Sequence, residues 1–355
     1  MKLKIAQVPG GLIPFSPELL SSPSSVTNIS YLLSEELVKR GHEVTVFAPT
    51  DSKTSAKLAS GWMSSVDKHL DINNKKGYEL FKKYCENVVK QSHKFDIIHV
   101  HDPAIDRFWG LFEFSKNIKT PVIATFHNPK FYDENKKRLS KIMFVGISQR
   151  QIENNPNFNF IGKVYNGTPL QLYSFNKKPQ DYLFWLGRIS PEKGTLEAIK
   201  VAKETKKKLF IAGYFHPDHK DYMEKVKKEI RENKNIKFLG FLSTKEKIKY
   251  LKNAYCLLVP IKWEEPFGLV MIEAMACGTP VIAFNKGSAP EIIKDGVTGF
   301  AVNNLKEMVG AIEKIKTIDR KKCRQWVEKN FTVEKMVDGY EKIYREVIKK
   351  YKKNI

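Results

Sequence analysis

The sequence lacks the long apolar run that would place it in a membrane. In its 355 residues, no stretch approaches the roughly 20 consecutive apolar residues of a membrane-spanning helix. Its start, MKLKIAQVPGGLIPF, resembles a signal peptide only superficially, because Pro9, Gly10 and Gly11 interrupt the apolar run and no small-residue cleavage site follows cleanly. We interpret this start as a strand followed by a turn, and we expect a cytoplasmic protein.

Cysteine is scarce, and several motifs are missing. The four cysteines lie far apart with no C-x-x-C spacing, which argues against a zinc site or dithiol redox chemistry; they are Cys85, Cys256, Cys277 and Cys323. The first glycine turn does not have the G-x-G-x-x-G spacing, so a dinucleotide-binding fingerprint is not supported. We find no short internal repeat and no low-complexity tract.

Acidic residues are outnumbered, since 61 Lys and Arg face 39 Asp and Glu and leave a net charge of +22. The lysines are spread over many segments, and aromatic residues do not interleave with them in a groove-like pattern. No nucleic-acid-binding motif is present, so we expect no nucleic-acid partner. Two interpretations stay open: a lysine-rich solvated surface, or peripheral contact with an anionic membrane at its inner face.

The length is too great for one ordinary core and suits two domains. In the first half, short apolar strands are expected at Leu3–Val8, Glu43–Phe47, Asp96–Val100, Pro121–Phe126 and Lys141–Ile147. A helix is expected between the first two strands, with apolar residues at Val26, Ile29, Leu32, Leu33 and Leu37 and a stop at Gly41. Strands that alternate with helices predict a parallel, doubly wound α/β sheet.

The second half restarts this pattern with a strand at Asp181–Gly187 and a helix at Gly194–Thr205, and the segments KKLFIAG, NIKFLG and AYCLLVP supply further strands. The polar stretch Asn166–Gln180 is the best linker candidate. We therefore expect an N-terminal Rossmann-like domain at 1–170, a second one at 180–332, and a terminal helix at 333–355. Ligands of such sheets bind at the carboxyl ends of the strands, where chemistry should reside in strand-to-helix loops.

Two such loops of the second half carry charge. Arg188 and Lys193 follow a strand end, and two cations there suit a diphosphate. In WEEPFGLVMIEAMACG, Glu265 precedes a helix that is expected at Leu269–Ala276, and Glu273 lies about 7 Å along that helix. The free N–H groups at the helix start suit a phosphate, and the two carboxylates suit sugar hydroxyls. Ordinary exposed cations, and acids favoured by the helix dipole, are the alternative interpretation.

The first half offers glycines and histidines. Gly10 and Gly11 let the backbone approach a ligand closely. His99 and His101 stand two apart at a strand end and so share one side, and His127 follows another strand. A histidine there could hold a sugar hydroxyl or stabilise developing charge, although a satisfied core histidine is an equal alternative. Metal binding by His99, His101 and Asp102 lacks a further cluster of ligands, so no metal is expected.

The segment EEPFGLVMIEAMACGTPVIA closely resembles the E-x7-E signature of retaining glycosyltransferases of family 4, which have the GT-B fold. The segments HEVTVFAP, DIIHVHDP, LGRISPEKG, IAG, FLGFLS and GSAPEIIKDGVTGF resemble further blocks of that family in the same order. SKTSAKL and VGISQRQ look most like a bacterial and archaeal subgroup that includes antibiotic-tailoring sugar transferases. One departure is Ser24–Ser25, where related sequences often carry a second glycine pair.

The resemblance implies two Rossmann-like domains that face each other across a cleft, with a C-terminal helix that crosses back to the first domain. It implies that Arg188 and Lys193 hold the diphosphate of a nucleotide-sugar donor, that Glu273 binds the ribose, and that Glu265 binds hydroxyls of the transferred sugar. His127 would contact the donor sugar near the reacting carbon. The other donor-binding positions implied are Gly10, Gly11, Gly187, Gly213, Phe241, Pro266, Phe267, Gly268, Leu269 and Val270.

His101 and Asp102 are expected on the acceptor side, and the acceptor is a sugar, a glycolipid or a small molecule. The activity implied is transfer of a hexosyl group from a UDP- or GDP-sugar to a hydroxyl, with retention and without a metal or other cofactor, consistent with the missing D-x-D motif. Two alternatives stay open: a nucleotide-sugar 2-epimerase of the same fold, and a non-catalytic basic protein that binds membranes or polyanions.

Overall fold

The structure is a computed structural model that describes residues 2–9, 13–17, 25–59, 75–101, 118–129 and 142–353. The chain divides into two compact units: unit 1 comprises Met1–Gly167 and Val333–Ile355, and unit 2 comprises Thr168–Thr332. The first division falls inside the stretch that we interpreted as a linker. Among the described residues, no helix is both long and apolar enough to cross a membrane.

Unit 1 contains a seven-stranded parallel sheet with the order β3-β2-β1-β4-β5-β6-β7. Its strands are β1 (Lys4–Val8), β2 (Glu43–Val46), β3 (Lys57–Leu58), β4 (Ile97–Val100), β5 (Val122–Thr125), β6 (Met143–Gly146) and β7 (Phe160–Lys163). The helices described in this unit are α1 (Ser25–Lys39), α2 (Lys75–Gln91), α5 (Gln149–Glu153) and α13 (Val333–Lys353).

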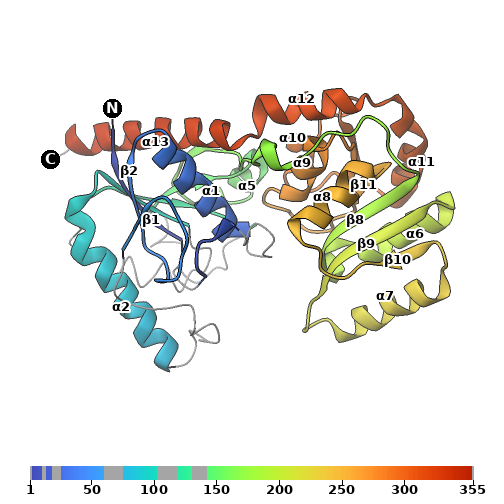
Figure 1. Cartoon of the computed structure of the whole chain (residues 1–355), viewed down its shortest axis with the longest axis horizontal. Coiled ribbons are helices and arrows are strands. Elements are labelled where there is room, and N and C mark those ends of the chain that lie inside the picture. The colour runs from blue at the N-terminus through green and yellow to red at the C-terminus, as the bar shows by residue number, and fades with distance from the viewer. Residues whose placement is uncertain are drawn as a thin grey trace. The chain divides into compact units, whose positions relative to one another are not determined.

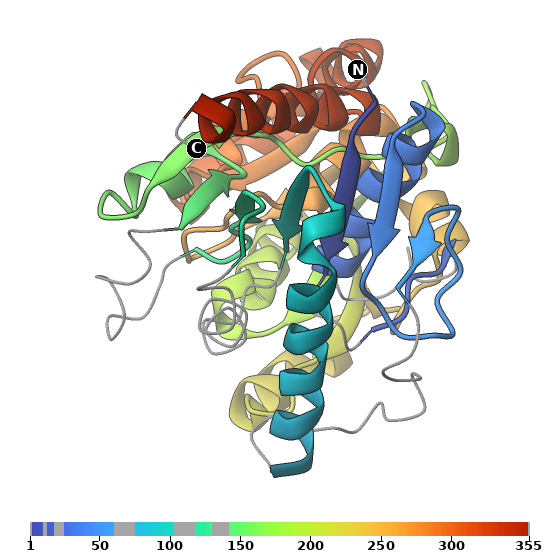
Figure 2. The same ribbon diagram turned by 90° about the vertical axis from the view of Figure 1, so that its left-hand side faces the viewer.

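The two faces of this sheet differ in chemistry. One face is apolar: Ala6, Ile98 and Ala124 pack with Tyr84 and Val88 of α2 in one core cluster. Because side chains alternate along a strand, the neighbouring residues point to the other face, which α13 covers. Figure 2 shows α13 (red) and α2 (cyan) on opposite sides of the strands of unit 1.

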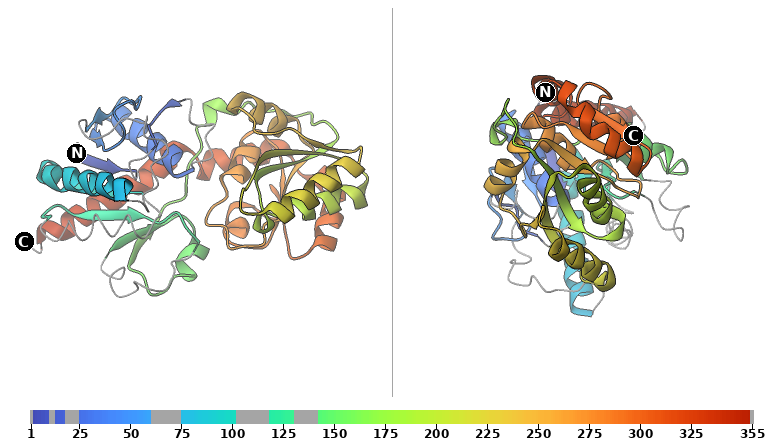
Figure 3. Two further views of the ribbon diagram at one scale, coloured as in Figure 1. Left: turned by 90° about the horizontal axis from the view of Figure 1, so that it is seen from below. Right: turned by 90° about the vertical axis from the view of Figure 1, so that its right-hand side faces the viewer.

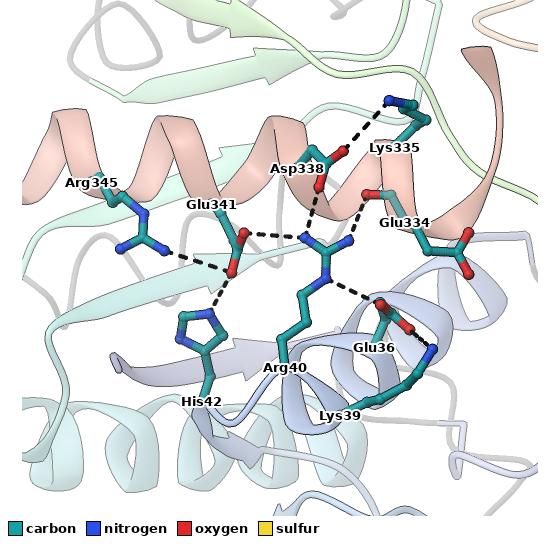
Figure 4. A network of polar contacts seen from close by, with 9 residues as sticks. All are labelled: Glu36, Lys39, Arg40, His42, Glu334, Lys335, Asp338, Glu341 and Arg345. Carbon is teal, nitrogen blue, oxygen red and sulfur yellow. Dashed lines mark hydrogen bonds and ion pairs between the residues drawn. The ribbon is translucent and has the colours of Figure 1, made fainter. Parts of the chain in front are cut away.

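The terminal helix α13 is held to unit 1 by an apolar stripe and by charge. Its buried residues recur at helical spacing: Val333, Met336, Val337, Tyr340, Ile343, Tyr344, Val347 and Ile348. Beside this stripe, Arg40 at the end of α1 contacts Asp338 at 2.8 Å, Glu341 at 3.1 Å and the Glu334 carbonyl at 3.0 Å. His42 bonds Glu341 at 2.6 Å, so both ends of the α1–β2 connection contact the terminal helix (Figure 4).

Unit 2 contains a six-stranded parallel sheet with the order β10-β9-β8-β11-β12-β13. Its strands are β8 (Tyr182–Ile189), β9 (Lys208–Phe215), β10 (Ile236–Phe238), β11 (Cys256–Val259), β12 (Val281–Phe284) and β13 (Gly299–Val302). Its α-helices are α6 (Thr195–Thr205), α7 (Lys220–Glu232), α8 (Thr244–Asn253), α9 (Leu269–Ala276), α10 (Ala289–Ile292), α11 (Leu305–Lys314) and α12 (Arg320–Asn330).

The helices of unit 2 lie in two layers. Helix α6 contacts both α7 and α11 on one face of the sheet, whereas α9 contacts both α8 and α12 on the other (Figures 1 and 3). The prediction of two parallel, doubly wound α/β sheets followed by a C-terminal helix is confirmed.

Candidate active-site residues

The charged loops of unit 2 lie where its strand order reverses. Strands β8 and β11 are neighbours at the centre of the sheet, and their carboxyl ends lead into the short helix η7 (Pro191–Lys193) and into the loop Pro260–Gly268. At such a switch point the connections leave toward opposite faces of the sheet, which is where ligands of open α/β sheets bind. Sequence analysis placed both motifs at this edge.

Glu265 forms an ion pair with Lys193. The Lys193 Nζ to Glu265 Oε2 distance is 2.5 Å, and the side chains are 20% and 13% exposed. The Trp263 indole N–H donates to the same carboxylate oxygen at 2.6 Å, and Lys193 Nζ lies 4.7 Å from the centre of the Trp263 ring. Neither Trp263 nor this pairing was predicted, because the pair joins residues 72 positions apart in the chain.

Close backbone contacts fix the loop that carries Glu265. Gly194 has φ +72, and a Cβ there would lie 1.9 Å from the Pro260 carbonyl oxygen. Gly287 has φ +53, and a Cβ there would lie 2.3 Å from the backbone N of Glu265. Glycine is therefore needed at both positions, and it allows the loops after β8 and β12 to pack directly against the Glu265 loop.

The helix α9 begins directly after this loop. Its N-cap, Gly268, is left-handed with φ +75, and no side chain caps the helix. The backbone N–H groups of the first turn include those of Leu269 and Val270, which an α-helix leaves without an intrahelical acceptor. Pro266 and Phe267 before the cap are buried, and Ser288 Oγ donates to the Phe267 carbonyl at 2.6 Å. The helix start is thus rigid and suited to an anion.

Glu273, at the fifth position of α9, has its own counter-charge. Lys247 Nζ of α8 contacts Glu273 Oε1 at 2.7 Å, and the two side chains are 14% and 15% exposed. The Tyr173 hydroxyl donates to the same oxygen at 2.8 Å, and burial raises the pKa of Tyr173 well above its usual value, so it stays a donor. Sequence reasoning missed both partners, and Tyr173 lies in the stretch that was interpreted as a linker.

Arg188, near the end of β8, forms an ion pair with Glu192 in the following helix η7. Its Nη2 contacts Glu192 Oε1 at 2.7 Å, and Ser190 Oγ donates to that oxygen at 2.6 Å. Burial alone would raise the pKa of Glu192, but the hydrogen bonds from Ser190 and Arg188 outweigh it and lower the pKa to about 2. Among the described residues, the buried Arg188 Nε has no hydrogen-bond partner, which leaves this guanidinium with a free donor.

Three other expected donor positions lie on the strands β8 and β9 and after β10. Gly213 has φ +140, and a Cβ there would lie 1.8 Å from the Gly187 carbonyl oxygen, so β8 and β9 approach closely at this edge. Phe241 follows β10 and is 53% exposed, which is unusual for an aromatic side chain. Both observations are compatible with a flat ligand at the carboxyl edge, and neither identifies one.

The predicted histidines of unit 1 share one face, as expected. The rings of His99 and His101 are 3.8 Å apart, and those of His101 and His127 are 5.8 Å apart. His99 and His101 are fully buried, whereas His127 is partly exposed, so of the three rings only that of His127 reaches the surface of the described residues. Gly10, Gly11 and Asp102 lie outside the described residues.

All three imidazoles are kept neutral by their surroundings. Burial lowers the pKa of His99 and His101 well below the usual value, and it lowers that of His127 to about 4. A neutral His127 can exchange hydrogen bonds with a hydroxyl but contributes no full positive charge. Within the described ranges, no group of three or more His, Cys, Asp or Glu residues is arranged to hold a metal ion.

Family models match nearly the whole chain. The model of Glycosyl transferases group 1 matches residues 151–332, and that of Glycosyltransferase Family 4 matches residues 26–151. An uncharacterized 41.2 kDa protein of the cps region of Klebsiella pneumoniae is 31% identical over 292 residues, which is 71% of this chain and 79% of that protein.

Solved structures share the fold. AviGT4, a glycosyltransferase involved in avilamycin A biosynthesis, superposes with a TM-score of 0.73 at 20% identity, over 98% of each chain. Anabaena Alr3699/HepE in complex with UDP and glucose superposes with a TM-score of 0.74 at 17% identity, over 96% of this chain and 99% of that one. Two Rossmann-like sheets, a terminal helix and both family models agree: the chain belongs to the group 1 glycosyl transferases and is a glycosyltransferase with the GT-B fold.

Proposed function

We propose that this glycosyltransferase moves a hexosyl group from a nucleotide diphosphate sugar to a hydroxyl of its acceptor, with retention of the anomeric configuration and without a metal ion. The observation that carries the proposal is the pairing of Glu265 with Lys193 and of Glu273 with Lys247, on either side of the α9 N-terminus. The two carboxylates lie eight positions apart, as in the E-x7-E pattern.

A nucleotide sugar matches this alternation of charge. Its diphosphate can bind Lys193, the free donor of Arg188 and the N–H groups at Leu269 and Val270. When Lys193 pairs with the diphosphate, the sugar hydroxyls can donate to the carboxylate of Glu265 in its place. Because each group exchanges one partner for another, no charge becomes buried without compensation. Glu273 would bind the ribose, with Tyr173 and Lys247 holding its carboxylate in place.

The choice of nucleotide follows the structural relatives. HepE was crystallised with UDP and glucose, and with UDP-glucose, so UDP is the first nucleotide to test and GDP the second. Phe241 and Gly213 stand at the edge where the base would lie. The acceptor is proposed as a sugar, a glycolipid or a small molecule.

The reaction is proposed as a front-face displacement. The bond between the anomeric carbon and the diphosphate oxygen breaks while the acceptor oxygen bonds to that carbon on the same face, and the acceptor proton passes to the leaving diphosphate. The cations and the helix N-terminus stabilise the negative charge that develops on the leaving group. Glu265 positions the sugar, and His127 contacts it near the reacting carbon. A covalent route would need a carboxylate on the opposite face, and we assign none.

A panel of UDP- and GDP-sugars, each with and without candidate acceptors, tests the activity by nucleotide release. Release that depends on an acceptor and persists in EDTA, with a product of the same anomeric configuration as the donor, is expected. Acceptor-independent release with a changed sugar would indicate a 2-epimerase instead. Absence of thermal stabilisation by every nucleotide and nucleotide sugar would contradict the proposal.

Glu265→Ala should lower turnover at least tenfold while the fold and the thermal stability of unit 2 persist, because the sugar loses an ionised acceptor. Glu265→Gln, which keeps the size but not the charge, should lie between the wild type and Glu265→Ala. Unchanged turnover in Glu265→Ala, measured at saturating donor, would show that Glu265 does not position the sugar.

A further inference from the structure

A chain of hydrogen bonds crosses the buried polar face of the unit 1 sheet. Gln7 of β1 occupies its middle: its Oε1 accepts from His101 Nε2 at 2.8 Å, and its Nε2 donates to the Tyr344 hydroxyl of α13 at 3.2 Å. Beyond His101, the His101 Nδ1 to His127 Nε2 distance is 3.5 Å. Beyond Tyr344, its hydroxyl lies 2.7 Å from His99 Nδ1, and His99 Nε2 lies 2.7 Å from Thr125 Oγ1.

The amide of Gln7 sets the direction of the bonds on the His101 side of this chain. An amide oxygen accepts only, so His101 must carry its proton on Nε2 and leave Nδ1 bare. The bare His101 Nδ1 can only accept, so His127 must donate from its own Nε2. On the other side, the Tyr344 hydroxyl accepts from the amide N–H and can either donate to His99 Nδ1 or accept a second bond from it, so Gln7 does not fix the tautomer of His99.

One other arrangement satisfies the bonds of His101 and His127. If the amide were turned over, both bonds would reverse, and both rings would carry their proton on Nδ1. The tautomers of His101 and His127 are therefore coupled through one side chain, and a mixed pair would leave a buried donor facing a donor. The structure has the Gln7 oxygen toward His101, which selects the Nε2–H form for both rings.

We propose that Gln7 is a positioning residue, which acts through His101 to hold His127 in the Nε2–H form and so presents the bare His127 Nδ1 as a hydrogen-bond acceptor for a hydroxyl of the substrate. This inference rests on the proposed function, because it gives His127 a substrate to meet. It makes His127 selective for a ligand group that can donate, such as a sugar hydroxyl, over a group that can only accept, such as an ionised phosphate oxygen.

Neutral rings are a condition of this arrangement, since a doubly protonated imidazole has no acceptor. Among the residues that the structure describes, the titratable groups that face His101 are His99 of β4, His127 after β5, and, through Gln7 and His99, the hydroxyls of Tyr344 and Tyr340 on α13. Burial lowers the pKa of the three histidines and raises that of both tyrosines, so these five groups are uncharged near neutral pH.

The wild-type protein provides the first test. The ring-nitrogen shifts of ¹⁵N-histidine-labelled protein distinguish Nε2–H from Nδ1–H tautomers, and His→Gln variants assign the three rings. His101 and His127 should both be in the Nε2–H form. An Nδ1–H form at His127, or different tautomers at His101 and His127, would overturn the proposal without any measurement of activity.

Gln7→Met provides the second test. It removes the acceptor from His101 Nε2, so His101 is expected to move its proton to Nδ1 and donate to His127 Nε2, because an unpaired buried donor is costlier than an unpaired acceptor. His127 should then appear as the Nδ1–H form, and sugar transfer should fall at least tenfold with the affinity for the free nucleotide unchanged. An unchanged His127 tautomer would disprove the coupling, and unchanged transfer with a reversed tautomer would disprove the role of Nδ1.

Thr125→Val is the matched control. It removes the Thr125 hydroxyl that contacts His99 and Tyr340 on the same buried face. The contacts of Gln7 with His101 and of His101 with His127 do not include Thr125, and the hydroxyl of Tyr344 can bond either tautomer of His99. Its transfer rate should stay within about twofold of the wild type although the stability of unit 1 falls, and a loss equal to that of Gln7→Met would assign the effect to stability alone. If wild-type protein transfers no sugar from any donor, the proposed function fails, whereas the ring-nitrogen shifts still decide the tautomers.

Discussion

Glu265 and Glu273 each have a lysine as counter-charge, but only one of the two lysines could be identified from the sequence. Lys193 stands in the LGRISPEKG segment, which sequence analysis identified, whereas Lys247 lies among many lysines on α8 and carries no motif. Only the packing of α8 against α9 distinguishes Lys247 from the neighbouring lysines. Through this packing, Lys247 contacts Glu273, which lies 26 positions further along the chain. In a lysine-rich sequence such a residue has no local signal.

We therefore predict that Lys247→Ala raises the dissociation constant for the nucleotide diphosphate about tenfold. Glu273 would keep Tyr173 but lose its cation, and an uncompensated carboxylate repels an anionic ligand. Titration calorimetry with UDP and GDP measures the effect. Lys249→Ala is the control, because it removes an equal charge from an exposed position of the same helix and should change affinity less than twofold. If both substitutions raise the dissociation constant equally, Lys247 acts only through the net charge of the protein.

The buried histidines predict how unit 1 responds to acid. Unfolded histidines bind a proton near pH 6.5, whereas the lowered pKa values keep His99, His101 and His127 neutral in the fold. Their contribution to stability is therefore fully present above about pH 6.5, and it is lost as the pH falls toward the folded pKa values, by about 1.4 kcal/mol per pH unit for each histidine.

Hydrogen exchange of β4 and β5 amides between pH 7.5 and 5, corrected for the intrinsic rate, measures this slope. His127→Gln removes one titrating group, so its slope should be about one third smaller than that of the wild type. A stability of unit 1 that does not change with pH would mean that the three rings bind protons in the fold as they do in the unfolded chain.

At the level of elements, hydrophobic pattern predicted the central strands and missed the edges. The strands β1, β4, β8 and β11 are mostly apolar and mostly buried, as expected for parallel strands covered on both faces. The edge strand β7 is only partly buried, and β13 is four residues long and begins at Gly299 with φ +153, so neither has a clear periodic signal. Sequence analysis did not identify helix α7, because the helix is rich in lysine and Val226 is its one fully buried residue.

In the candidate site, too, the sequence indicated some features and missed others. Sequence motifs singled out Arg188, Lys193, Glu265 and Glu273, and the bounds of α9 match the expected Leu269–Ala276. The partners of these residues depend on which loops the sheet order brings together, and a parallel sheet joins segments that are remote in the chain. Pattern therefore indicates which residues carry charge, whereas only the fold shows how each charge is balanced.

Arg40 is expected to contribute most to the attachment of α13 by charge. Arg40→Met would leave Asp338 and Glu341 without their main cation and should lower the free energy of unfolding of unit 1 by about 1–3 kcal/mol (Figure 4). Urea denaturation followed by far-UV circular dichroism measures it. Lys39→Met, which removes an exposed cation that pairs with Glu36 alone among the described residues, should leave the midpoint of urea denaturation nearly unchanged. Equal losses would show that Arg40 acts only as one more surface charge.

For the whole molecule, the net charge of +22 predicts salt-sensitive adsorption to anionic surfaces. The last turn of α13 adds Lys350, Lys352 and Lys353 to this charge. Vesicles with about one third anionic lipid should retain the protein at 20 mM salt and release it near 300 mM, since charges are screened beyond about 10 Å already at 0.1 M. Neutral vesicles are the control. No retention at low salt would leave the charge as a property of the solvated surface, with no support for a lipid-linked acceptor.

Because α13 belongs to unit 1, the two units differ in how early they can fold during translation. Unit 2 is one continuous segment whose ends, Thr168 and Thr332, pair side by side, so it can fold before synthesis is complete. Unit 1 cannot fold so early, because its sheet is made well before the 21-residue helix that covers Gln7 and His99. Until residues 333–353 have been made, the histidine face of the nascent first half lacks the helix that buries it.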